Sequence, residues 1–118
     1  MTRRNLAIVL LTSALVLPFG ANGSEAAGKK GNFASHKKYK VKGTATVSGS
    51  SIKLSGFSTT PGPDLYVYVG NGRATKLVAR LKRNSGSQTY SLPGADKYST
   101  VHIHCKRFSS TFGTARLK

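Results

Sequence analysis

Apolar and polar residues alternate with a period of two in short runs along most of the chain, and turn-forming residues separate these runs. In "DLYVYV", for example, Leu65, Val67 and Val69 alternate with Tyr66 and Tyr68. Successive side chains of a β-strand point to opposite faces, so this pattern predicts strands with one buried face. We find no stretch with convincing helical periodicity. The chain is therefore predicted to be all-β.

The runs recur at a regular spacing. They predict about seven strands, over residues 39–47, 52–54, 65–69, 74–81, 87–92, 98–105 and 112–117. The sequence "SGSS" predicts a hairpin between the first two strands, and Asn71-Gly72 favours a type I′ turn between the next two. Such spacing is typical of an antiparallel β-sandwich or barrel. About ninety residues suffice for one small domain with one core.

The N-terminal segment, residues 1–26, is predicted to be a cleavable signal peptide. Arg3 and Arg4 precede an apolar run, residues 6–17, and a region of small residues follows it. This run is too short for a bilayer span, which needs roughly 20 residues. Small residues favour cleavage after Gly23 or after Ala26. We therefore expect a secreted, periplasmic or cell-envelope protein.

The mature domain is strongly cationic. The whole chain has 19 Lys and Arg against 3 acids; cleavage after Gly23 removes two arginines and leaves +14, and cleavage after Ala26 leaves +15. Outside the cytosol, such a charge favours anionic lipid, wall polymers or acidic proteins, and nucleic acid is an unlikely partner. Much of the charge lies in residues 28–42. We expect residues 27–38 to form a basic, solvated arm before the domain of residues 39–118, with lysines continuing along an edge strand.

The acidic residues argue against a hydrolase. The chain contains three, Glu25, Asp64 and Asp96. Glu25 belongs to the signal region, and Asp96 lies in a predicted turn, so the chain offers little material for paired-carboxylate catalysis. We therefore do not expect a hydrolase, and the scarcity of acids leaves other kinds of enzyme open.

The segment "VHIHCKRF", residues 101–108, contains the only cysteine, Cys105. A lone cysteine cannot form an internal disulfide, so Cys105 is a buried inert thiol, an intermolecular partner, or a reactive or cofactor-binding group. Alternation places it on the face of Val101 and Ile103, which favours a core position. His102 and His104 lie on the opposite face. They could contribute two ligands to a metal, but two ligands make a weak site, and we predict none.

Three blocks of the sequence resemble the signature of the DM-thirteen family of electron-transfer-type domains. The blocks are "GPDLYVYV", "NSGSQTYSLP" and "VHIHCKRFSSTFGTARL", and the likeness begins near Gly31 and runs to Leu117. The most specific part is the pattern of Cys105, Phe108, Phe112, Gly113, Ala115 and Leu117.

The resemblance implies an all-β module whose single cysteine, here Cys105, serves redox chemistry as a bare thiol or as a ligand to a prosthetic group such as haem. The family often has an aromatic residue where this chain has His104, and an aliphatic residue where it has His102. We expect Arg107 to share the face of Cys105 if the strand stays regular, which would favour a thiolate. The alternative is a non-catalytic, cationic envelope-binding or adhesive domain with a structural core cysteine.

Overall fold

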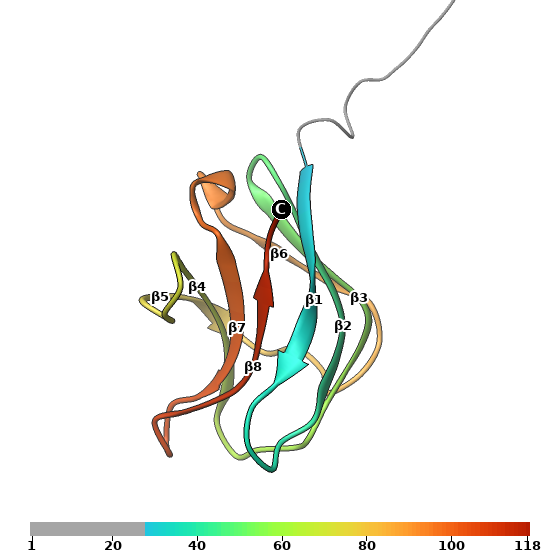
Figure 1. The fold of residues 1–118 in the computed structure, drawn as a ribbon, viewed down its shortest axis with the longest axis vertical. Coiled ribbons are helices and arrows are strands. Elements are labelled where there is room, and N and C mark those ends of the chain that lie inside the picture. The colour runs from blue at the N-terminus through green and yellow to red at the C-terminus, as the bar shows by residue number, and fades with distance from the viewer. Residues whose placement is uncertain (1–27) are drawn as a thin grey trace, which may run out of the picture.

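The computed structural model describes residues 28–118, and the predicted signal peptide lies outside them. These residues form eight strands and one short 3-10 helix (Figure 1). The elements are β1 (Gly28–Ser35), β2 (Val41–Ser48), β3 (Ser51–Thr59), β4 (Leu65–Gly70), β5 (Lys76–Arg80), β6 (Gln88–Ser91), η3 (Ala95–Lys97), β7 (Thr100–Cys105) and β8 (Ser110–Arg116). The helix η3 contains Asp96, in the region predicted to be a turn.

The strands form one antiparallel sheet in the order β5-β4-β7-β8-β1-β2-β3-β6. Its two end strands, β5 and β6, approach each other where the Lys82 backbone N–H donates a hydrogen bond of 2.9 Å to the Tyr90 hydroxyl. The sheet is therefore a nearly closed barrel, which leaves little exposed strand edge. The all-β prediction is confirmed, with eight strands in place of about seven.

The additional strand is β1, and it corrects the prediction of a solvated arm over residues 27–38. β1 lies inside the sheet, between β2 and β8. Only Phe33 of its eight residues is buried, so the strand lacks the apolar alternation that reveals its neighbours. Gly31 permits a close approach to β8: a Cβ there would lie 1.9 Å from the Arg116 carbonyl oxygen. Backbone pairing, rather than apolar patterning, holds β1 in place.

The two predicted turns differ in outcome. "SGSS" does connect a hairpin, in which Ser48 pairs with Ser51. Asn71-Gly72 does not form a two-residue type I′ turn, because residues 71–75 make a longer loop and only Gly72 of the pair has a positive φ, of 118°. The Asn71 side chain instead accepts a hydrogen bond of 2.9 Å from the Ser99 N–H.

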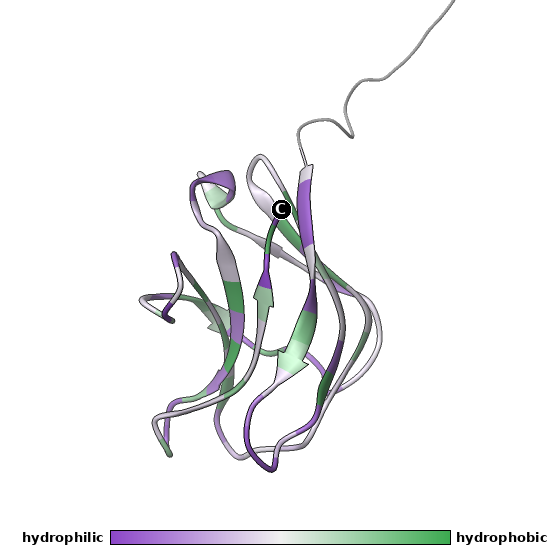
Figure 2. Ribbon diagram, in the orientation of Figure 1, coloured by the Kyte–Doolittle hydropathy of each residue, from purple (hydrophilic) through white to green (hydrophobic). Residues whose placement is uncertain are grey.

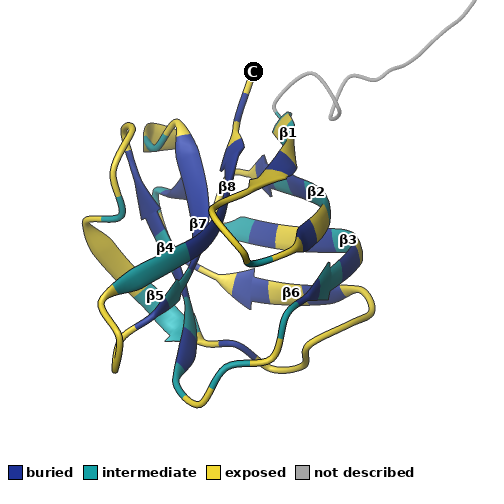
Figure 3. Cartoon of the chain, turned by 60° about the horizontal axis from the view of Figure 1, so that its bottom comes forward, coloured by how far each residue is buried: buried dark blue, intermediate teal, exposed yellow. Residues whose placement is uncertain are grey.

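The core fills the interior of the barrel, where the inward-facing residues of every long strand meet (Figures 2 and 3). The predicted alternation in β4 is confirmed: Leu65, Val67 and Val69 are buried, whereas Tyr66 and Tyr68 are only partly buried. Tyr39 stacks on Phe112 with 3.7 Å between ring centroids, and thereby closes the end of the barrel near the β1–β2 turn. Within residues 28–118 no helix has the length and apolarity that crossing a bilayer requires.

Candidate functional site

Cys105 is the last residue of β7, and its side chain faces the core. It is fully buried, as are Val101 and Ile103 on the same face, which confirms the predicted alternation. Across the sheet Cys105 pairs with Leu65 of β4 and with Ser110 of β8. The thiol thus lies in apolar surroundings at the end of a strand, next to the turn that connects β7 to β8.

The turn of residues 106–109 ends the strand immediately after Cys105. Its closing hydrogen bond runs from the Ser109 N–H to the Lys106 carbonyl, at 3.2 Å, and Ser109 has a positive φ of 50°. Arg107 is exposed in this turn. The expectation that Arg107 shares the face of Cys105 is therefore wrong, because the strand does not stay regular up to that residue.

The opposite face of β7 carries a network of histidine and threonine side chains. His102 lies within 2.8 Å of the Thr100 hydroxyl through Nε2 and within 2.9 Å of the Thr114 hydroxyl through Nδ1. Thr114 also lies 3.0 Å from Nε2 of His36. His102 is only 2% exposed, although alternation predicts a polar outward face. The 71–75 loop explains this burial, since the Gly72 N–H donates to the Thr100 hydroxyl across the same face.

The network holds His102 in its neutral form. Burial, followed by the nearby His36, His104 and Arg116, lowers the pKa of His102 to about 4. Burial also lowers the pKa of His104, whose Nδ1 lies 3.0 Å from the Thr111 hydroxyl. Both ring nitrogens of His102 are engaged by threonines, and residues 28–118 contain no group of three His, Cys, Asp or Glu side chains placed to hold a metal ion.

A hollow of about 300 Å³ opens over this network. No pattern in the sequence predicts this hollow. Its floor comes from β7 and β8, and its walls come from the 71–75 loop and from His36 after β1. The lining residues are His36, Gly72, Arg73, Ala74, His102, His104, Thr111 and Thr114. His36 and His102 are 66 positions apart in the chain, so only the three-dimensional fold brings them together.

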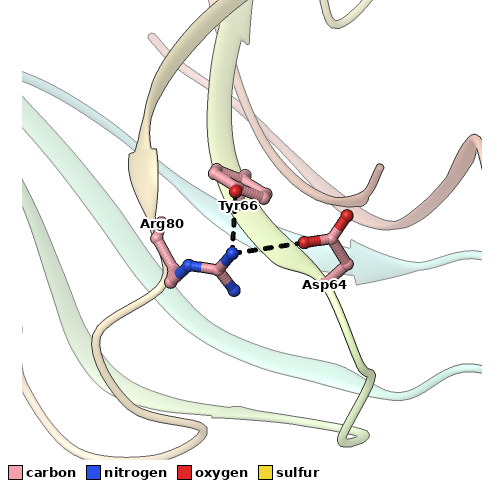
Figure 4. Close-up of polar contacts among 3 residues, drawn as sticks. All are labelled: Asp64, Tyr66 and Arg80. Carbon is pink, nitrogen blue, oxygen red and sulfur yellow. Dashed lines mark hydrogen bonds and ion pairs between the residues drawn. The ribbon is translucent and has the colours of Figure 1, made fainter. Parts of the chain in front are cut away.

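Asp64 has a structural role at the start of β4. Its carboxylate lies 3.4 Å from the Arg80 guanidinium, which also donates a hydrogen bond of 2.9 Å to the Tyr66 hydroxyl (Figure 4). The Asp64 backbone carbonyl accepts from the Lys106 N–H at 3.0 Å. Asp64 therefore joins β4 and β5 and anchors one end of the 106–109 turn.

A comparison with known protein families identifies the family of this chain. The family model described as electron transfer DM13 matches residues 32–117, which is most of the chain. The chain belongs to the electron transfer DM13 family. No curated protein and no solved structure matches it. Family membership makes this domain an electron-transfer-related module, and it confirms the resemblance carried by the three sequence blocks.

Most residues of the DM13 pattern in this chain serve packing. Phe112 and Ala115 are buried, and Gly113 lets β8 pass close to β2, since a Cβ there would lie 2.7 Å from Cβ of Val41. Phe108 is the exception: it is 54% exposed, in the turn that follows Cys105. Phe108 therefore adds little to the core of this DM13 domain.

The residues around Cys105 do not fit a haem ligated by this cysteine. Such a ligand needs open space beside the sulfur for the macrocycle, but Cys105 is fully buried in the packed core. Neither the hollow over His102 nor the one beside it is lined by Cys105. The histidines nearest in sequence lie on the opposite face of the sheet. We therefore derive no chemistry for this DM13 domain through haem.

Proposed function

We propose that this protein is an exported electron-transfer module in which Cys105 acts as a bare redox thiol. Membership of the DM13 family carries the proposal, together with the position of Cys105 at the end of β7 beside a short turn. In this role the Cys105 thiolate attacks a disulfide of a partner protein. A sulfur–sulfur bond forms between Cys105 and one partner sulfur, and the other partner sulfur leaves as a thiolate. The partner disulfide is the oxidant.

The buried thiol must become accessible for this exchange. The 106–109 turn is the element whose opening would expose it, because the turn starts at the residue after Cys105. Two backbone hydrogen bonds would break in this opening: the one that closes the turn, from the Ser109 N–H to the Lys106 carbonyl, and the one that anchors its start, from the Lys106 N–H to the Asp64 carbonyl. Ser109 has a positive φ, a backbone conformation that is strained for residues other than glycine. The exposed Phe108 contributes little packing that would hold the turn closed. These features place the turn among the less stable parts of the domain.

The exchange can be tested with a small disulfide. Folded protein incubated with oxidised glutathione should gain the mass of one glutathione per chain, and Cys105→Ala should gain none. Dithiothreitol should reverse the addition. If the folded protein remains unmodified whereas urea-unfolded protein reacts, Cys105 is a core residue and the redox proposal fails.

Export is part of the proposal and rests on the sequence of residues 1–26, which lie outside the described residues. An oxidising compartment supplies the partner disulfides that the proposed exchange needs. N-terminal sequencing of protein recovered from the cell envelope or the medium should begin at Ser24 or Ala27. Exported protein that begins at Met1 would exclude a cleavable signal peptide.

A second candidate function is binding to anionic lipid through the end of the barrel that carries the β1–β2 and β7–β8 turns (Figure 1). The exposed Phe108 favours lipid binding, because its aromatic side chain could enter a headgroup layer and the basic residues Lys106 and Arg107 directly precede it. Lys37 and Ser109 line one hollow at this end, so the two turns are neighbours. Here Cys105 would have only its packing role.

Vesicle binding separates this candidate from general attraction by charge. Vesicles containing phosphatidylglycerol should retain the protein, and Phe108→Ala should weaken retention while leaving the thermal unfolding midpoint unchanged. Leu77→Ala is the matched control, since Leu77 is also exposed but belongs to β5. Equal retention of both variants, or retention that added salt does not weaken, would contradict this function.

A further inference from the structure

The hollow over His102 combines positive charge with hydroxyl groups and lacks acids. Arg73 enters its lining from the 71–75 loop, and His36 and His104 line it from β1 and β7. No Asp or Glu is among the lining residues. A volume of about 300 Å³ lies at the small end of the range for ligand pockets, so it suits an ion or a small molecule.

The hydrogen bonds of the network leave donors available for such a ligand. His36 uses Nε2 toward Thr114, and His104 uses Nδ1 toward Thr111. When each ring is protonated, its second nitrogen also carries a hydrogen that can be donated. The Arg73 guanidinium adds a rigid fork of donors that suits the oxygens of phosphate.

These features favour an anion over a metal cation. A cation would meet Arg73, and among residues 28–118 there is no three-ligand cluster to hold it. We propose that the hollow is a binding site for a small tetrahedral oxyanion of the phosphate class, held by Arg73, His36 and His104. This site is independent of Cys105, which faces the core on the other side of β7.

The Lys, Arg and His side chains around the hollow all favour the binding of an anion. His102 and His104 come from β7, Arg116 from β8, His36 and Lys37 from the β1 end, and Arg73 from the 71–75 loop. The ring of Tyr68 from β4 lies 5.0 Å from that of His104. A bound anion relieves the repulsion among the positive charges, so binding should strengthen as the pH falls and His104 gains a proton, whereas His102 stays neutral above its pKa of about 4.

Calorimetric titration with sodium sulfate tests the site directly, with sodium chloride of equal ionic strength as the reference. The charge of sulfate is constant between pH 5.5 and pH 8, so any change in affinity with pH comes from the protein. We expect saturable binding of one sulfate per chain, tighter at pH 5.5 than at pH 8, with inorganic phosphate competing. Arg73→Gln should weaken binding about tenfold, the loss expected for one charge-assisted hydrogen bond. His36→Asn should also weaken binding, because it changes one of the three side chains proposed to hold the anion.

Arg107→Gln is the matched control, because it removes the same charge from an exposed turn outside the hollow. It should change sulfate affinity by less than about twofold, the scale of an exposed charge at a distance. Vesicles of phosphatidylglycerol identify the source of the anion. If inorganic phosphate displaces the protein from vesicles and Arg73→Gln removes that competition, the site binds a headgroup; if phosphate binds without displacing vesicles, the site binds the free ion. Non-saturating binding, or equal losses for Arg73→Gln and Arg107→Gln, would overturn the proposal.

Discussion

At the scale of single residues, the packing of Cys105 has a measurable cost when the side chain is changed. Cys105→Ala removes one buried sulfur and should lower the free energy of unfolding by on the order of 1 kcal/mol. Cys105→Ser should lower it further, because a hydroxyl in apolar surroundings needs a hydrogen-bond partner. Urea denaturation of the three proteins measures both changes. A serine variant as stable as the alanine variant would show that the thiol position is polar or open to water.

The burial of His102 predicts that the free energy of unfolding depends on pH. Its folded pKa is about 4, whereas an unfolded histidine has a pKa near 6.5. Above pH 6.5 both states are neutral and the residue adds no pH dependence. Between pH 6.5 and 4 only the unfolded state takes up the proton, so stability should fall by about 3 kcal/mol as the pH is lowered.

His102→Val is the control for this effect, because it places a side chain that does not titrate at the same buried position. Urea denaturation between pH 7.5 and 4 should show a clearly shallower loss of stability for the variant, and His104, whose pKa burial also lowers, contributes to the remaining loss. The same slope in both proteins would mean that His102 is not buried in the neutral form.

At the scale of elements, the 71–75 loop depends on Gly72. Its φ of 118° is one that side chains rarely adopt, and no atom within 4 Å would contact an added Cβ. Any loss in Gly72→Val therefore reports backbone strain, which we expect to lower the free energy of unfolding by about 1 to 3 kcal/mol. Ala74→Val, in the same loop at a residue without positive φ, should cost much less. An unchanged melting temperature for Gly72→Val would show that the loop has another conformation.

Strands with strict alternation could be predicted from the sequence, and β4 and β7 are examples. β1 could not, because its position depends on backbone pairing with β2 and β8 and only Phe33 of its side chains is buried. Similarly, the sequence places His102 on the outward face of β7 but cannot show that the 71–75 loop covers it. The hollow was missed for the same reason: Arg73, His36 and His102 come together only through long-range contacts.

At the scale of the whole molecule, the sheet of the barrel separates Cys105 from the histidine network. The core face of β7 holds Cys105, and the outer face carries the histidine network and the hollow. The sheet therefore lies between the thiol and the cationic groups of the hollow, and the exposed 106–109 turn directly follows Cys105. The redox proposal depends on whether that turn opens while the barrel stays folded.

Maleimide labelling of Cys105 in low concentrations of urea measures this opening most directly. We expect that folded protein is labelled, and that the labelling rate changes little with urea well below the unfolding transition, because a local opening exposes little surface. If the labelling rate instead rises with urea in step with the population of globally unfolded protein, the thiol is reached only by complete unfolding. That result would contradict a redox role for Cys105.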